Sequence, residues 1–166
     1  MADIPSTPAD GNYKVVWVPA LANPDAPTVA EVTGGTVIDL SCYLTADGWI
    51  PGLSEQVIAD DRLCSTETFE QVGRAARTLS VRYIINPGDT TNNKASDTLV
   101  PGTDGYLVTR AGKAFSTALV ATDKVWVWPV TPGKYSELPP EANSVLKQEQ
   151  KMFVRARVRA NVAVAA

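Results

Sequence analysis

Turn-forming dipeptides recur along this chain and are its strongest local signal. Four Pro-Gly pairs and three Asp-Gly pairs occur, at Pro51-Gly52, Pro87-Gly88, Pro101-Gly102, Pro132-Gly133, Asp10-Gly11, Asp47-Gly48 and Asp104-Gly105. Proline presets φ for the second residue of a turn, and glycine accepts the positive φ that a type II turn needs next. The sequence therefore predicts short elements separated by turns.

The segments between the predicted turns have the composition of β-strands. Residues 14–18, 79–85, 106–110 and 125–130 are rich in Val, Ile, Tyr and Trp, and weaker strand candidates lie at 28–32, 37–40 and 55–59. One short helix is expected around residues 91–99, with Asp89, Thr90 or Thr91 as its cap and Pro101 just beyond its end. Many short strands with one flanking helix predict a mainly β fold, a sandwich or a barrel.

The C-terminal segment shows strict alternation with a period of two. Every even position is apolar, namely Met152, Val154, Ala156, Val158, Ala160, Val162 and Val164. Polar and basic residues fill most of the odd positions, with Phe153 and Ala163 as exceptions. This pattern predicts one long strand with a buried face. Its length exceeds the usual five or six residues, so we expect it to extend past the edge of its domain and offer an unpaired end to another chain.

Length and composition predict one folded domain. The chain has 166 residues, 45% of them hydrophobic and 20% charged, which suffices for a core without disulfides or metals. We expect residues 1–12 to be a flexible N-terminal arm and residues 13–166 to be a single β-rich domain. No signal peptide and no apolar run of membrane-spanning length occurs. The two cysteines, Cys42 and Cys64, are interpreted as reduced core residues, although they could pair.

The sequence lacks the residues of common active sites. It has no histidine, which excludes Ser-His-Asp and Cys-His catalysis and the commonest metal ligand. Ser144 and Lys147 match S-x-x-K, but the companion motifs of that chemistry are absent. Asp60 and Asp61 are neighbours whose side chains point apart in an extended segment, so solvated loop acids are expected. We predict no catalytic, cofactor or metal site.

Two tryptophans and three arginines remain as candidate contact residues. Trp126 and Trp128 share one face of a strand whose other face is also apolar, which favours a strand covered by the core and by a neighbouring subunit. The alternative is a carbohydrate-binding β-sandwich of the adhesion type, with these side chains, Trp17 or Trp49 as stacking platforms.

A basic face is formed by Arg155, Arg157 and Arg159 on the predicted C-terminal strand. Nucleic acid is disfavoured as its partner because the net charge is -3 and no aromatic ladder accompanies the arginines. An acidic protein surface is the better partner for these side chains. We therefore expect them to lie at a subunit interface.

Four stretches of the chain resemble the major tail tube protein of long, non-contractile-tailed bacteriophages of actinobacteria. They are VVWVPALANPDAPTVAEV (15–32), IDLSCYLTADGW (38–49), DTLVPGTDGYLVTRAG (97–112) and VRARVRANVAVA (154–165). The resemblance implies a β-sandwich or closed sheet with one flanking helix, and rings of six copies whose inner wall is a β-barrel. It also implies stacking into a hollow tube in the virion tail. Synthesis would occur in the host cytoplasm, other tail proteins would bind the tube ends, and DNA would pass through the lumen without tight binding.

Overall fold

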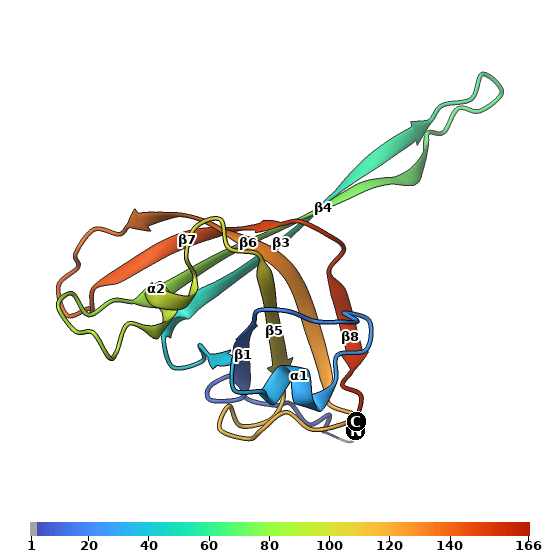
Figure 1. The fold of residues 1–166 in the computed structure, drawn as a ribbon. Helices are drawn as coiled ribbons and strands as arrows, with labels where there is room; N and C mark the ends of the chain where they lie inside the picture. Colours follow the sequence, from blue (N-terminus) through green and yellow to red (C-terminus); the bar gives the residue numbers. More distant parts are fainter. Residues whose placement is uncertain (1–2) are drawn as a thin grey trace.

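The computed structural model describes residues 3–166, and these form eight strands and two short helices (Figure 1). In chain order they are β1 (Tyr13–Val18), α1 (Val29–Thr33), β2 (Ile38–Asp39), β3 (Leu44–Asp60), β4 (Phe69–Ile84), α2 (Lys94–Thr98), β5 (Gly105–Ala111), β6 (Lys124–Glu137), β7 (Lys147–Val154) and β8 (Arg159–Ala163). The mainly β class predicted from the sequence is confirmed.

The strands join in one antiparallel sheet. Its order is β2-β1-β5-β6-β7-β4-β3, and β8 pairs with β6 beside this path. The sheet curls into a half-barrel, as Figure 1 shows, so a single bent sheet takes the place of two stacked layers.

Both faces of the sheet are apolar near its centre. In β1, Val15 and Trp17 join one core cluster, and Val16 and Val18 join a second. The first cluster continues through β4, β5, β6 and β7 to Leu99 beside α2, and the second is covered by α1 and the last residues of the chain. The near-continuous apolar sequence of β1 follows from this two-sided burial.

The predicted strand at 28–32 is wrong, because this segment forms α1. Thr28 is the N-cap and accepts a hydrogen bond from the Glu31 backbone N–H. The Glu31 carboxylate in turn accepts from the Thr28 backbone N–H at 2.9 Å and from the Ala22 N–H at 2.7 Å. This capping box satisfies donors at the helix start and overrides the strand preference of the two valines.

The predicted helix at 91–99 is present as α2 but is shorter, and the structure has a second helix that the sequence reading missed. The N-cap of α2 is Asn93, which makes no side-chain cap bond. Asp89 instead accepts from the backbone N–H groups of Thr91 and Asn92, in the turn that precedes the helix.

Two of the four Pro-Gly pairs form the predicted turns. Gly88 and Gly102 have φ of 86° and 84°, values that favour glycine. The other two pairs lie inside strands, Pro51-Gly52 in β3 and Pro132-Gly133 in β6. A register shift follows Pro132, so this proline lies beside a β-bulge.

Strands β3 and β4 form a hairpin far longer than the short elements that the turn signals predicted. β4 also pairs with β7, from Ile84 to Leu79, but its residues 69–78 have only β3 beside them. At about 3.3 Å per residue, this part projects roughly 30 Å from the half-barrel, as Figure 1 shows. We call residues 53–77 the hairpin arm.

The prediction of a single long C-terminal strand is also wrong, since residues 155–158 separate β7 from β8. Both strands run along β6, with Val154 opposite Val130 and Arg159 opposite Val127. The Arg155 N–H donates to the Pro129 carbonyl at 3.1 Å, so the N–H that Pro129 lacks would point to the same side. The ladder is interrupted where this donor is missing.

Both cysteines are exposed, so their prediction as core residues is wrong. Cys42 lies in the turn before β3 and Cys64 in the loop at the end of the hairpin arm, and neither is in a disulfide. Cysteine's frequent burial is only a statistical tendency and gives no information on loop positions.

Residues 3–12 contain no helix or strand, and Ile4 is 92% exposed. The backbone carbonyls of Gly11 and Asn12 accept hydrogen bonds from Phe115 and Gly112, which tie the end of this segment to the loop after β5. The flexibility expected for residues 1–12 stays a prediction, and residues 1–2 lie outside the described part. None of the helices described here has the length and apolar character needed to cross a membrane.

Candidate assembly surface

An aromatic cluster lies at the base of the hairpin arm. The Trp126 and Trp128 rings stack with 6.3 Å between centroids, and Trp49 meets Trp128 edge-on at 6.0 Å. Together with Tyr13 these rings line an apolar cavity of about 360 Å³. Burial raises the pKa of the Tyr13 hydroxyl.

The four tryptophans offer no open stacking platform for a sugar. Trp17 and Trp128 are 3% exposed, and Trp49 and Trp126 are half-buried against the core. The Arg77 guanidinium also lies 5.4 Å from the centroid of the Trp126 ring. Trp128 is thus covered by its own chain, which already supplies the two-sided burial that a neighbouring subunit was expected to provide. Trp126 keeps partial exposure and remains a candidate contact residue.

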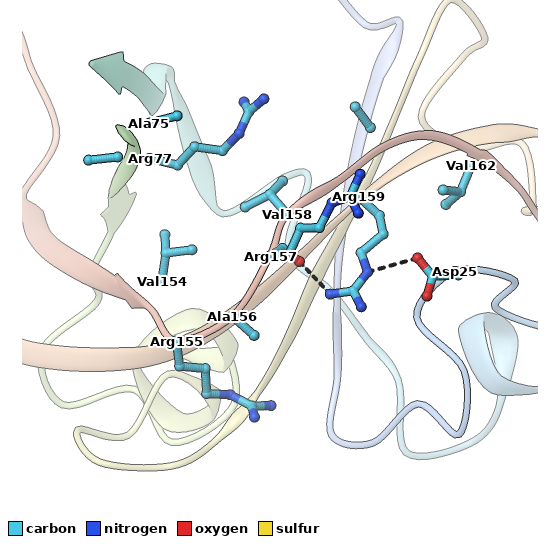
Figure 2. Close-up of a pocket in the computed structure, with 12 residues that line it drawn as sticks. Asp25, Ala75, Arg77, Val154, Arg155, Ala156, Arg157, Val158, Arg159 and Val162 are labelled. Atoms are coloured by element: carbon cyan, nitrogen blue, oxygen red, sulfur yellow. Dashed lines mark hydrogen bonds and ion pairs between the residues drawn. The ribbon is translucent and has the colours of Figure 1, made fainter. Parts of the chain in front are cut away.

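The three predicted arginines line one cleft of about 800 Å³, shown in Figure 2. A fourth, Arg77 from the hairpin arm, lines it as well. We call Arg77, Arg155, Arg157 and Arg159 the arginine cluster. Nothing in the sequence linked Arg77 to the other three, because strand pairing between distant segments brings it there.

The arginines of the cluster do not point outward together from one strand, as the sequence pattern suggested. Arg159 turns back to Asp25, with 2.9 Å between Nε and Oδ1, and also donates to the Arg157 carbonyl (Figure 2). The Arg155 guanidinium lies 5.0 Å from the centroid of Tyr106. The interrupted strand at residues 155–158 permits these separate directions.

Positive charge dominates the cleft. Asp25 is the one carboxylate among its lining residues in the described chain. The hydrogen bond from Arg159 lowers the pKa of Asp25, and the charges of Arg159 and Arg157 lower it further. Asp25 is therefore ionised at neutral pH and offsets one of the four positive charges.

The hairpin arm carries several exposed apolar side chains. Six of its large hydrophobic side chains are half or more exposed, namely Leu53, Val57, Ile58, Leu63, Phe69 and Val72. Val57 and Val72 are direct partners across the two strands and so share one face. Large exposed apolar patches on soluble proteins are typical of contact sites, so the arm is a candidate contact surface.

The other residues considered for chemistry are not brought together. Lys147 binds Glu141 at 3.3 Å, and Asp60 accepts hydrogen bonds from Arg62 and Gln71 at 2.9 Å and 3.0 Å. Within residues 3–166 no group of three or more His, Cys, Asp or Glu side chains is placed to hold a metal ion.

A family model described as phage tail tube protein matches residues 1–166, the whole chain. The chain belongs to this family. No curated protein matches this tail tube protein in sequence.

Solved structures of injection-system components resemble the fold of this tail tube protein. One is described as an extracellular contractile injection system, PVC sheath/tube terminator in extended state, with a TM-score of 0.56, 14% identity, and 96% of each chain covered. Another is the anti-feeding prophage baseplate, 6-fold symmetrised, with a TM-score of 0.55, 11% identity, and 93% of this chain and 97% of that one covered. A third is the anti-feeding prophage tube-terminating cap, with a TM-score of 0.51, 12% identity, and 96% and 95% covered. At these identities the likeness concerns the fold.

Proposed function

We propose that this tail tube protein is the repeating subunit of the tube, that copies form rings of six, and that the rings stack into the hollow channel through which the genome leaves the virion. The hairpin arm is the observation that carries this proposal. A two-stranded hairpin that is exposed to water on both faces is at best marginally stable, so we expect a partner to cover the arm.

The arm can supply substantial contact energy. Burying a large apolar side chain completely contributes about 1.5–3 kcal/mol, so covering the exposed half of one contributes roughly 1 kcal/mol. The arm carries six such side chains, and a ring or tube repeats the contact once per subunit. The free edges of β3 and of residues 69–78 also present unpaired backbone groups that can join another sheet.

The ring number, the genome passage and the type of tail rest on the resemblance to tube proteins of long, non-contractile tails. The similar solved structures come from contractile injection systems, and since they share the fold alone they leave the tail type to be tested. Other tail proteins would bind the ends of the tube. The protein would act in the virion tail without catalysis, after synthesis in the host cytoplasm, and its net charge of -3 would limit DNA binding in the lumen.

Electron microscopy of the concentrated, purified chain tests the proposal. We expect hollow tubes built of repeating rings, and classification of end views gives the number of copies per ring. Rings that never stack would identify a tube terminator instead. The similarity in fold to terminator and cap structures is the reason to consider this alternative. A chain that stays monomeric at every concentration would contradict both roles.

A variant pair tests whether the arm is the contact. Val57→Ser with Val72→Ser removes two exposed apolar groups that face each other on the arm, and should prevent assembly while the monomer still folds. Val100→Ser with Val145→Ser is the matched control, since these valines are 46% and 60% exposed outside the arm. The control should assemble as the parent chain does.

A further inference from the structure

We infer that the acidic end of the hairpin arm of one copy binds the arginine cluster of the next copy. This inference rests on the proposed function and names the partner of the cleft. The arm tip, defined as residues 60–70, carries Asp60, Asp61, Glu67 and Glu70 against one basic residue, Arg62.

The cleft has more positive charge than its own chain neutralises. Arg159 forms an ion pair with Asp25, but within the described chain no ion pair joins Arg77, Arg155 or Arg157 to a carboxylate. Arg77 lies over the Trp126 ring, and Arg155 lies over the Tyr106 ring and donates to the Gly105 carbonyl. Guanidinium groups gathered in one cleft repel each other, so an acidic partner lowers the free energy of the arrangement.

The arm tip has the opposite imbalance. Asp60 pairs with Arg62. Across residues 3–166, Asp61, Glu67 and Glu70 take part in no ion pair, and all three are exposed. Three free carboxylates thus match three free guanidinium groups. Arginine binds a carboxylate through two parallel hydrogen bonds, which sets the orientation of the contact as well as its strength.

The tip cannot reach the cleft of its own chain. Ala75, Ala76 and Arg77 line the cleft at the base of the arm, while the tip ends at Glu70 on the same strand. Five residue steps of extended strand separate Glu70 from Ala75, roughly 17 Å, and the arm points away from the half-barrel in Figure 1. The acids therefore serve a second copy.

The cleft also accommodates the apolar part of the tip. Between the arginines its lining consists mostly of small side chains, including Ala75, Ala156 and Val158. Leu63, next to Cys64 at the end of the arm, is fully exposed. A contact of tip to cleft uses two different surfaces of the same chain, so it is heterologous and passes from copy to copy along an assembly.

Exchange of the charges tests this contact. The cleft variant is Arg155→Glu with Arg157→Glu, the tip variant is Asp61→Arg with Glu67→Arg, and the exchanged variant carries all four substitutions. Each of the first two should assemble at least about ten-fold less well, because like charges then face each other. The exchanged variant should recover tube formation, since opposite charges meet again.

Controls separate this contact from folding and from net charge. Lys94→Glu with Lys134→Glu makes the same charge change as the cleft variant on exposed residues outside the cleft, and should assemble normally. Urea unfolding of dilute monomers should show that all variants fold.

Normal assembly of either single-sided variant, or failure of the exchanged variant to recover, overturns the inference. In both cases the proposed function stands if the parent chain forms tubes. A parent chain that stays monomeric overturns the two together.

Discussion

Asp123 allows the sharpest test of the energetics of this fold. The residue is 5% exposed, and its carboxylate binds the Lys113 ammonium, accepts from the Val120 N–H at 3.1 Å and lies 3.4 Å from the Arg110 guanidinium. Arg110 is 2% exposed and donates to the carbonyls of Ala114 and Ala118. These bonds tie the loop after β5 to the sheet. We predict that Asp123→Asn strongly destabilises the chain.

The magnitude follows from the buried charge that remains. Removing one partner of a buried ion pair typically costs about 3–5 kcal/mol, because the other charge stays uncompensated. Asparagine keeps an acceptor for the Val120 N–H, so we expect about 3 kcal/mol, and a larger loss for Asp123→Ala. Glu141→Gln breaks an exposed ion pair with Lys147 and should cost about 0–1 kcal/mol as the control.

The loss of unfolding free energy in Asp123→Asn should depend on pH in a defined direction. Burial alone would raise the pKa of Asp123, but hydrogen bonds from Lys113 and the Val120 N–H lower it overall. The stability that this carboxylate contributes is present above its pKa in the unfolded chain, about 3.9, and is lost as the pH falls through the lower pKa of the folded chain.

Urea unfolding followed by tryptophan fluorescence measures the effect, at a fixed low protein concentration that excludes assembly. The difference between the parent chain and Asp123→Asn should be largest at neutral pH and shrink toward pH 3. A loss below about 1 kcal/mol at pH 7, or a loss independent of pH, would refute the assignment of a stabilising buried charge.

Three further outcomes are expected. Thr28→Ala should lower the free energy of unfolding by about 1 kcal/mol in the same urea assay, because α1 loses its cap, and an unchanged midpoint would contradict this. Gly105→Ala should destabilise the fold severely, since an added Cβ would lie 2.2 Å from the Trp17 ring; thermal unfolding equal to that of the parent would count against this packing. Cys42 and Cys64 should both react quickly with a thiol reagent in the native monomer, as each is exposed and unpaired, and slow labelling detected by intact mass would disprove their exposure.

The strands of the half-barrel could be predicted from the sequence because burial imposes a pattern on them. In residues 79–85 the side chains of Leu79, Val81 and Tyr83 are buried as their alternation indicates. The predicted segments at 14–18, 106–110 and 125–130 also lie in strands. The contribution of each face to a different core cluster could not be predicted, because it depends on which distant segments cover the sheet.

Local signals failed where two of them competed. The spacing of Thr28 and Glu31 is that of a capping box, and this signal was present in the sequence but was outweighed by the β-branched residues between and around them. The glycines at 52 and 133 were predicted as turn residues, yet both lie in strands against a neighbouring chain segment. Glycine is needed at both positions because a neighbouring segment of the chain approaches the backbone closely. A Pro-Gly pair in the sequence does not distinguish this role from a turn.

The C-terminal alternation shows how a regular pattern led to an incorrect element. Met152 and Val158 are buried in one core cluster and Val164 in the other, while Ala156 and Ala160 are exposed, so the even positions do not form one buried face. The continuity of the strand also failed, because it depends on the partner strand, and Pro129 of β6 has no N–H to offer where the ladder is interrupted. The interruption is also what turns Arg155 and Arg157 into the cleft beside Arg77, away from a flat strand face. A straight strand would have placed all three arginines on one face, whereas the interruption sends the Arg155 guanidinium toward Tyr106 and the Arg159 guanidinium toward Asp25. All three still line the cleft at the base of the arm, where we propose that the carboxylates of a neighbouring copy bind.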